Sequence, residues 1–402
     1  MRILCVFGRH AYGQVSRGEA YEYINFIPAL RALGHQVDHF DSWDRSLYED
    51  FGALNQTLIE TVQRMRPDIL LTVLMAYEIW TETLDRIRAN TGCRIVNWGT
   101  DDSWKYEQFT RLIAKHVDLH VTTSAAALAK AQRTGLNNIV LSQWAANHET
   151  LAEPLPSNQC RYDVSFVGAA YGNRRAWIEV IENAGMQVDC FGYGWPKGPV
   201  AAAEIPDIIH SSKLSLNFGD SGLHWAGWKL YRSRQIKARV FEVPGGGGCL
   251  LTEPAEDLSR YFDVSNEIEC FDSPQNLVSK LKRLLDNPEE RDRIARAGYQ
   301  RTRDEHTYIR RFEEIIAFLN DIDRRDVPIP KKSFALTRAQ HDSTFVLRFA
   351  KALLIHVCKL LFGPTRGPRA ARRTAFELSW RFSIARTYSA RGWVGRMFYH
   401  ES

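Results

Sequence analysis

The chain has 402 residues, 45% hydrophobic and 25% charged, a globular composition that is long for one domain. Its seven scattered cysteines include no C-x-x-C pair, which argues against a disulfide framework or a structural zinc site and favours a cytoplasmic location. The net charge of +5 is uneven, because residues 331–402 hold 14 Lys and Arg against 3 Asp and Glu, while residues 1–330 hold 38 against 44. The basic character belongs to the tail, so we expect no nucleic-acid partner.

Residues 1–155 alternate short apolar runs with helical stretches. RILCVFG ends at Gly8 and is typical of a buried parallel strand. The stretch EAYEYINFIPALRALG is helical, with Gly34 suited to end it, and a second helix is expected from about Leu54 to Met65. Further strands are expected in QVDHFD, DILLTVL, RIVNWGTDD, VDLHVTTS and NNIVLSQWAAN. This β-α alternation predicts an α/β, Rossmann-like domain with a doubly wound parallel sheet.

The same pattern restarts after a connector with two prolines, LAEPLPSNQCRY. Strands are expected in YDVSFVG, MQVDCFG, SSKLSLNF and CLLT, and helices start near Pro274 and Pro288. We therefore expect a second Rossmann-like domain over residues 156–326. In open α/β sheets ligands bind at the carboxyl ends of the strands, so two such domains facing a cleft predict a binding site there.

The stretch RVFEVPGGGGCLLTE contains four consecutive glycines. We expect a basic helix from about Trp228 to Val243 before them and a buried strand after them. A phosphate-cradling loop has the opposite order, with a strand first and a helix N-terminus last. The first glycine is therefore predicted to cap the helix and the others to pack closely. Arg239 and Glu242 are i, i+3 neighbours on that helix.

Glycine turns between a strand and a helix occur elsewhere in the second domain. FVGAAYGNRR contains Gly168 and Arg174, and FGYGW contains Tyr193 and Trp195, whose rings suit either stacking on a ligand or packing. Asn217 opens another glycine-rich loop at the end of a strand. Because none of these is a clean G-x-G-x-x-G fingerprint, an NAD-dependent enzyme is disfavoured.

In the first domain, NWGTDDSW places Asp101 and Asp102 at the carboxyl end of a strand. Paired carboxylates suit a divalent metal or a general base, but consecutive side chains point to opposite sides of a strand, so one of them is expected to cap the helix that follows. Glu78, in MAYEIW, is a second candidate base. The sequence has no H-E-x-x-H motif and no Ser-His-Asp spacing.

The tail, residues 327–402, has a different character. Its apolar run DSTFVLRFAKALLIHVCKLLFG is interrupted by Arg348, Lys351, His356 and Lys359, which argues against a bilayer span. At about 100° per residue Arg348, Lys351 and Lys359 cluster on one side, opposite Leu347, Leu354 and Leu361. This pattern predicts an interfacial amphipathic helix and peripheral contact of residues 343–398 with the inner face of the plasma membrane. The alternative is a helical tail that packs on the two domains.

Several of these runs together resemble the glycosyltransferase-like domain of spore-maturation CgeB-type proteins, over about residues 160–320. Its most specific pieces are R-x-F-E-x-x-x-x-G, from Arg239, and H-T-Y-x-x-R, from His306. In the first domain, W-x-x-D-D is the best match. The resemblance implies the GT-B architecture, with a nucleotide sugar held by the second domain, an acceptor held by the first and no bound metal cofactor.

The resemblance also implies roles for individual residues. Glu242 matches the second of two glutamates eight residues apart, the one that holds the donor ribose, whereas Arg234 stands at the first position. Arg239, Lys237 and Arg174 are the cations expected to neutralise the diphosphate. We therefore expect a glycosyltransferase that moves a sugar from a nucleotide-sugar donor to a cell-surface glycan or lipid-linked acceptor. The alternative is a non-catalytic nucleotide-sugar-binding or structural protein that keeps the fold.

Overall fold

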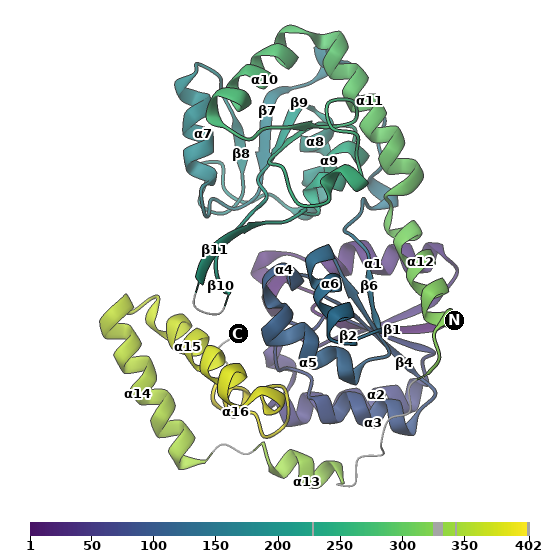
Figure 1. Ribbon diagram of the computed structural model, residues 1–402, viewed down its shortest axis with the longest axis vertical. Helices are drawn as coiled ribbons and strands as arrows, with labels where there is room; N and C mark the ends of the chain where they lie inside the picture. Colours follow the sequence, from purple (N-terminus) through teal and green to yellow (C-terminus); the bar gives the residue numbers. More distant parts are fainter. Residues whose placement is uncertain (227–228, 325–332, 342–343, 400–402) are drawn as a thin grey trace. The chain divides into compact units, whose positions relative to one another are not determined.

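The computed structural model describes residues 1–226, 229–324, 333–341 and 344–399. The chain forms two compact units, one of Met1–Leu141 with Ile316–Ser402 and the other of Ser142–Ile315 (Figure 1). From the sequence we expect boundaries after residues 155 and 326. The structure instead assigns the proline-containing connector to the second unit and the tail to the first.

The first unit is built on a six-stranded parallel sheet in the order β2-β1-β3-β4-β5-β6. Its strands match the apolar runs of the sequence: β1 (Arg2–Phe7), β2 (Gln36–Asp41), β3 (Ile69–Thr72), β4 (Arg94–Trp98), β5 (Leu119–Thr122) and β6 (Ile139–Leu141). All residues of β3 and β5 are buried. Runs this continuous are expected of parallel strands whose two faces are both covered.

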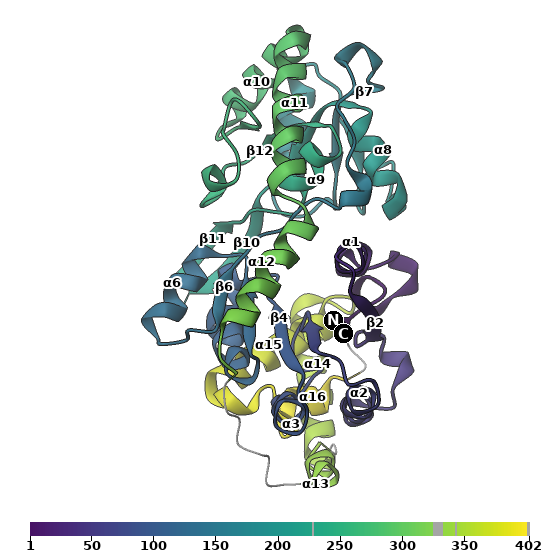
Figure 2. The same ribbon diagram turned by 90° about the vertical axis from the view of Figure 1, so that its right-hand side faces the viewer.

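Helices connect these strands: α1 (Tyr21–Ala32), α2 (Phe51–Met65), α3 (Thr81–Asn90), α4 (Asp102–Lys105), α5 (Arg111–Ile113) and α6 (Ala125–Arg133). Gly34 has φ +78° just beyond the end of α1, as its expected role in ending that helix requires. Asp50 caps α2, since its Oδ1 accepts the Ala53 amide at 2.7 Å. Helices α2 and α3 lie side by side (Figures 1 and 2).

The second unit holds a five-stranded parallel sheet in the order β13-β12-β9-β7-β8. Its strands are β7 (Tyr162–Val167), β8 (Asp189–Phe191), β9 (Ser212–Asn217), β12 (Cys249–Thr252) and β13 (Glu269–Cys270). Its helices are α7 (Arg174–Asn183), α8 (Ile205–His210), α9 (Arg239–Gly245), α10 (Pro274–Asp286) and α11 (Pro288–Glu305), and α12 (Tyr308–Asp321) leads back to the first unit. Two parallel sheets with helices confirm the predicted fold class.

One expected element of the second unit is wrong. Instead of a helix over residues 228–243, β10 (Asp220–Ala226) and β11 (Lys229–Arg234) form an antiparallel hairpin, and only α9 is helical. Aromatic residues in this part of the sequence, such as Trp225 and Tyr231, are typical of paired strands. The apolar stripe of the expected helix is nevertheless buried, at Ile236, Val240 and Val243.

The described residues of the tail form the α-helices α13 (Phe334–Ala339), α14 (Phe345–Phe362), α15 (Gly367–Phe382) and α16 (Trp393–Met397). Helices α14 and α15 form an antiparallel hairpin (Figures 1 and 2). Tyr388, Val394 and Phe398 are buried in the core of the first unit, where Tyr399 meets Phe51 edge-on at 4.6 Å. Much of the tail therefore packs on the first unit, which is one of the two domains that the alternative interpretation expects it to cover. A bilayer-spanning helix does not occur in the part of the chain that the structure describes.

Candidate functional site: an anion-binding edge in the second unit

The strand order of the second unit reverses at β7, which lies between β8 and β9. In open parallel sheets ligands bind outside the carboxyl ends of the strands at such a switch point. Two loops leave this edge, from Gly168 after β7 and from Phe218 after β9. Gly168 and Arg174 are therefore where the sequence expects donor contacts.

Arg174 begins α7 and is 8% exposed. It donates from Nη1 to the Ala169 carbonyl at 2.9 Å and from Nη2 to the Tyr171 hydroxyl at 3.0 Å, and its guanidinium lies 3.9 Å from the centre of the Tyr171 ring. The buried Nε has no hydrogen-bond partner among the described residues. Arg174 is thus a rigidly held cation with a spare donor.

The charges around Arg174 come from several elements of the second unit. Burial lowers the pKa of Arg174, and the positive charge of Arg239 acts in the same direction, while Tyr171, Asp220 and Glu253 oppose both. The Arg174 guanidinium therefore lies within electrostatic range of one other cation, Arg239, and of the two carboxylates Asp220 and Glu253.

Gly168 and Gly172 allow the loop after β7 to pass close to these groups. A Cβ at Gly168 would lie 2.9 Å from the Phe166 ring and 3.1 Å from Nη1 of Arg174. Gly172 has φ +64°, and a Cβ there would lie 3.1 Å from Oδ2 of Asp220. Only glycine fits both places without displacing a neighbour.

Glu242 and Arg239 form the expected ion pair on α9, with 2.7 Å between Oε2 and Nη1. Their side chains are 19% and 20% exposed, so both retain access to solvent. Lys237, two residues before Arg239, is partly buried. The structure therefore brings Arg174, Arg239 and Glu242 to the same part of the second unit.

Glu253 is a residue of this edge that sequence reasoning missed. It follows β12 and is 1% exposed. Its Oε2 accepts the Gly219 amide at 2.9 Å and the Asp220 amide at 3.3 Å, and its Oε1 lies 3.6 Å from Nη2 of Arg234. The position of Glu253 in the sequence could have indicated its place in the site, because an acid directly after a buried strand lies at the binding edge of the sheet.

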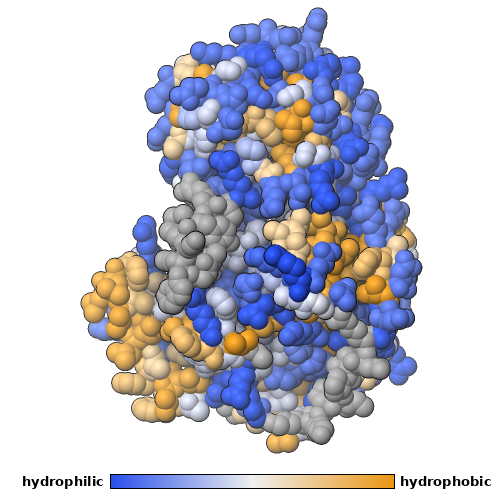
Figure 3. Space-filling model, in the orientation of Figure 1, coloured by the Kyte–Doolittle hydropathy of each residue, from blue (hydrophilic) through white to orange (hydrophobic). Residues whose placement is uncertain are grey.

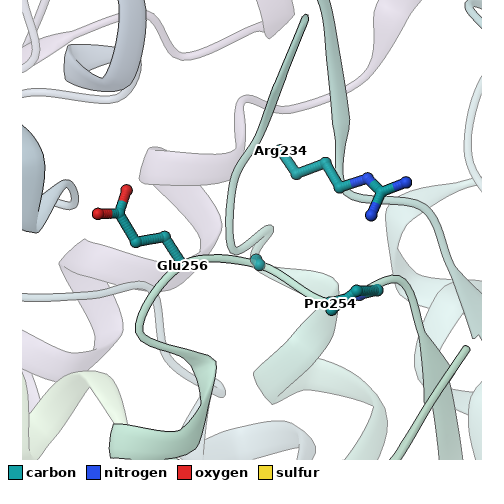
Figure 4. A pocket seen from close by; sticks show the side chains of 4 residues that line it. Arg234, Pro254 and Glu256 are labelled. Carbon is teal, nitrogen blue, oxygen red and sulfur yellow. The ribbon is translucent and has the colours of Figure 1, made fainter. Parts of the chain in front are cut away.

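Arg234 also lines an open pocket of about 520 Å³, together with Pro254, Ala255 and Glu256. Figure 4 shows the Arg234 and Glu256 side chains pointing away from each other. Through its contact with Glu253, Arg234 connects this pocket to the edge that carries Arg174.

The two other predicted donor contacts, Tyr193 and Asn217, differ in their accessibility to a ligand, and so does Trp195, which lies near Tyr193 in the sequence. Tyr193 is 51% exposed and free to stack on a ligand, whereas Trp195 is buried and donates from Nε1 to the Gly168 carbonyl at 2.7 Å, a packing role. Asn217 is buried, and its Nδ2 donates to Oγ1 of Thr252 at 2.9 Å. That amide therefore links β9 to β12.

The four glycines serve packing, as expected from their flanks, but α9 ends one residue later than predicted, with Gly246 as its C-cap. A Cβ at Gly245 would lie 2.6 Å from Cβ of Ala146. Gly247 has φ +79°, and a Cβ there would lie 2.7 Å from the Ala152 carbonyl. The run is thus pressed against the connector, which leaves no space for a phosphate.

In the first unit the two adjacent acids have different surroundings. Asp102 is buried, with 2.8 Å between Oδ2 and Nε2 of His120, and its Oδ1 accepts the Thr110 hydroxyl at 2.7 Å. Burial opposes its ionisation, but the charge and hydrogen bonds of its partners lower its pKa overall. Asp101 is 30% exposed and lies 3.6 Å from Nζ of Lys105. Asp101 is therefore the accessible member of the pair.

Glu78 and Glu22 are both buried carboxyl groups of the first unit. Glu78 is 1% exposed, and its two oxygens accept the amides of Met75 and Ala76, closing the turn after β3. Sequence reasoning missed Glu22, in the first turn of α1, whose pKa is raised to about 7 by burial, with a further contribution from Asp101. Only its burial distinguishes Glu22 from other acidic residues in helices.

Comparison with solved structures identifies similar folds. Sucrose-phosphate synthase from Thermosynechococcus elongatus has a TM-score of 0.56 at 10% identity, covering 80% of this chain and 99% of that chain. A glycosyltransferase from Rickettsia africae gives 0.54 at 11% identity, with 80% and 99% covered. HepE from Anabaena, solved with UDP and glucose, gives 0.53 at 11% identity, with 80% and 100% covered. At these identities the likeness concerns the fold.

A search of curated proteins finds no match. The model of the family described as "Glycosyl transferase-like" matches residues 174–317, which begin at Arg174 and include α9 and Glu253. The chain therefore has a GT-B fold, and its residues 174–317 match the glycosyl transferase-like family model.

Proposed function

We propose that this glycosyltransferase transfers a sugar from a nucleotide-sugar donor whose diphosphate binds at the edge of the second unit. The observation that carries the proposal is the buried guanidinium of Arg174, whose Nε has no hydrogen-bond partner among the described residues and which Arg239 also influences electrostatically. Lys237 adds a third cation to the same segment. Fixed cations at this place suit a diphosphate with two negative charges.

The same cations support the chemistry. The acceptor oxygen forms a bond to the anomeric carbon of the sugar, and the bond from that carbon to the diphosphate oxygen breaks. The electron pair leaves with the nucleoside diphosphate, whose added negative charge Arg174 and Arg239 stabilise. Since these cations neutralise the leaving group, the proposal requires no bound metal.

Glu242 is proposed to hold the donor ribose, since a carboxylate accepts hydrogen bonds from two neighbouring hydroxyl groups. The ion pair with Arg239 fixes the orientation of the Glu242 carboxylate beside the cations that are proposed to bind the diphosphate. The R-x-F-E-x-x-x-x-G run around it also supports placing the chain with the CgeB-like glycosyltransferases.

On the acceptor side, we propose that Asp101 takes the proton of the attacking hydroxyl group. It is accessible, while Asp102 and Glu78 are committed to internal hydrogen bonds. We further propose that the acceptor is a cell-surface glycan or lipid-linked precursor at the inner face of the plasma membrane, which the tail contacts within residues 343–398. The supporting observation is the basic, apolar composition of that segment.

Calorimetry with a panel of nucleotide sugars tests the donor site. Glu242→Ala should weaken binding by about tenfold or more, since it removes charge-assisted hydrogen bonds to the ribose. Glu179→Ala, which removes the same charge from an exposed position on α7, should bind like the unaltered protein. Equal affinity of the two variants for every donor would show that the assignment of Glu242 is wrong.

The second candidate is a protein that binds a nucleotide sugar without transferring it. It is favoured by Arg234, which stands where the resemblance implies an acid. Hydrolysis and transfer assays with the same donors separate the candidates, because a binding protein gives no nucleoside diphosphate above the spontaneous rate.

A further inference from the structure

Helix α14 presents three different surfaces around its axis. Its inward side contains Leu347, Leu354 and Ile355, which pack against the core of the first unit, and the buried Cys358. Two of these are leucines that the sequence pattern places on a lipid-facing side. The structure therefore shows that these two leucines lie on the side of α14 that packs against the first unit.

The opposite side of α14 is apolar and exposed. The outward face contains Phe345 (75% exposed), Val346 (71%), Phe349 (64%), Leu353 (55%), Val357 (42%), Leu360 (74%) and Leu361 (70%), and the exposed His356 lies among them. Five of these residues follow one another at intervals of four, so they line one side of the helix over its whole length. Figure 3 shows a corresponding hydrophobic area over α14. Isolated apolar residues are normal on a protein surface, but a continuous face of this kind marks an interaction site.

Cations border the outward face. Arg348 and Lys359 are exposed and lie, at about 100° per residue, beside the apolar arc of α14. Arg366, Arg369 and Arg373 are exposed in the turn after α14 and on α15. Residues 345–376 contain no Asp or Glu. The surface therefore combines an apolar centre with a purely basic border.

We infer that the outward face of α14 binds the surface of an anionic bilayer, with the helix axis parallel to the membrane plane. Its apolar side chains enter the boundary between headgroups and acyl chains, and the bordering cations meet lipid phosphates. In a pair formed by two copies through this face, the basic borders would face each other and repel, which disfavours self-association. Charge complementarity thus selects an anionic lipid surface.

The attachment of α14 gives this binding a consequence for the enzyme. Because α15 and α16 are built into the core, α14 is a fixed part of the first unit. Binding to a bilayer would therefore hold the acceptor unit at the membrane. This inference rests on the proposed function in one respect, since it identifies the acceptor as a molecule carried by the same membrane.

Vesicle flotation of the full chain tests the inference. The protein should float with vesicles of phosphatidylcholine and phosphatidylglycerol and much less with phosphatidylcholine alone. The double variant Phe349→Glu with Leu353→Glu should bind about a hundredfold more weakly, since each buried side chain of this size contributes roughly a factor of ten. Arg348→Glu with Lys359→Glu should lose the preference for anionic vesicles.

The matched control replaces Leu47 and Leu336, which are 58% and 59% exposed on other parts of the first unit, with Glu. This control has the same change in charge and a similar change in hydropathy, and it should float like the unaltered chain. Equal flotation of the α14 double variant and this control would overturn the inference. So would failure of the unaltered chain to float while it forms dimers that the α14 double variant abolishes.

Donor binding separates this inference from the proposed function. The α14 double variant should bind nucleotide sugars normally in solution, and Glu242→Ala should float normally. Loss of flotation alone would leave the donor site standing, and loss of donor binding alone would leave the membrane surface standing.

Discussion

Glu22 illustrates how a single buried carboxyl group makes stability depend on pH. Its pKa is about 7 in the folded chain, against 4.5 for the ordinary side chain, because burial disfavours its charged form. The folded protein therefore keeps a proton that the unfolded chain loses between these values. The resulting stabilisation is fully present below about pH 4.5 and is lost as the pH rises to 7.

Glu22→Gln should flatten this part of the profile. From pH 4.5 to 7 the free energy of unfolding of the unaltered chain should fall relative to that of the variant, by on the order of 3 kcal/mol. Urea unfolding at several pH values measures the difference. His306 makes the opposite contribution to the pH dependence of stability, because burial lowers its pKa to about 4. Both proteins contain His306, so its contribution cancels when the two profiles are compared. Parallel profiles would show that Glu22 is ionised in the folded state.

At this scale the sequence predicts what depends on spacing and misses what depends on burial. The separation of Arg239 and Glu242 is sufficient to expect their ion pair, which the structure confirms. The surroundings of Glu22 and Glu253 are assembled from distant segments and leave no local pattern. Arg174 was expected near the donor, but its proximity to Arg239 follows only from the packed sheet.

Among the elements, the glycine run shows most directly why particular residues are required. Gly247→Ala should destabilise the protein by about 2 kcal/mol or more, because the new Cβ would be strained at φ +79° and would clash with the Ala152 carbonyl. Gly185→Ala is the matched control, with φ +82° and no described atom within 4 Å of the new Cβ. It should cost only about 1 kcal/mol. Chemical unfolding measures both, and equal losses would mean that the contact with the connector is unimportant.

Most elements were predictable from the chain because apolar runs, glycines and caps act locally. Ser273 and Asn287 cap α10 and α11, where the sequence places their starts. The hairpin β10–β11 was not predictable in this way, since its residues also fit a basic helix and only strand pairing decides between them. For α14 the sequence indicates an amphipathic helix, but the side that faces outward depends on where its neighbours pack.

For the whole molecule, the main structural fact is that the first unit consists of both ends of the chain. Phe398 is 1% exposed in its core, whereas Phe382 on α15 is 81% exposed. Phe398→Ala should lower the free energy of unfolding by about 3–5 kcal/mol, the usual cost of emptying such a site, and Phe382→Ala should change it little. Thermal and urea unfolding provide the test. Similar stabilities would mean that the tail only rests on the surface.

The sequence does not reveal this arrangement, because the change in composition after residue 330 is also typical of a separate appendage. The contacts that join Tyr388 to Gln108 and Tyr399 to Phe51 span most of the chain. Periodicity describes each helix by itself and gives no information about which distant surface it will cover.

The divided first unit also has a consequence for synthesis on the ribosome. Its sheet is translated before the second unit, but the helices that complete its core are translated after it. The second unit is a continuous stretch and can fold as soon as it has emerged. The first unit is therefore expected to finish folding after the second, and the apolar surface of its sheet stays unprotected, within reach of chaperones, until the helices of the tail have emerged.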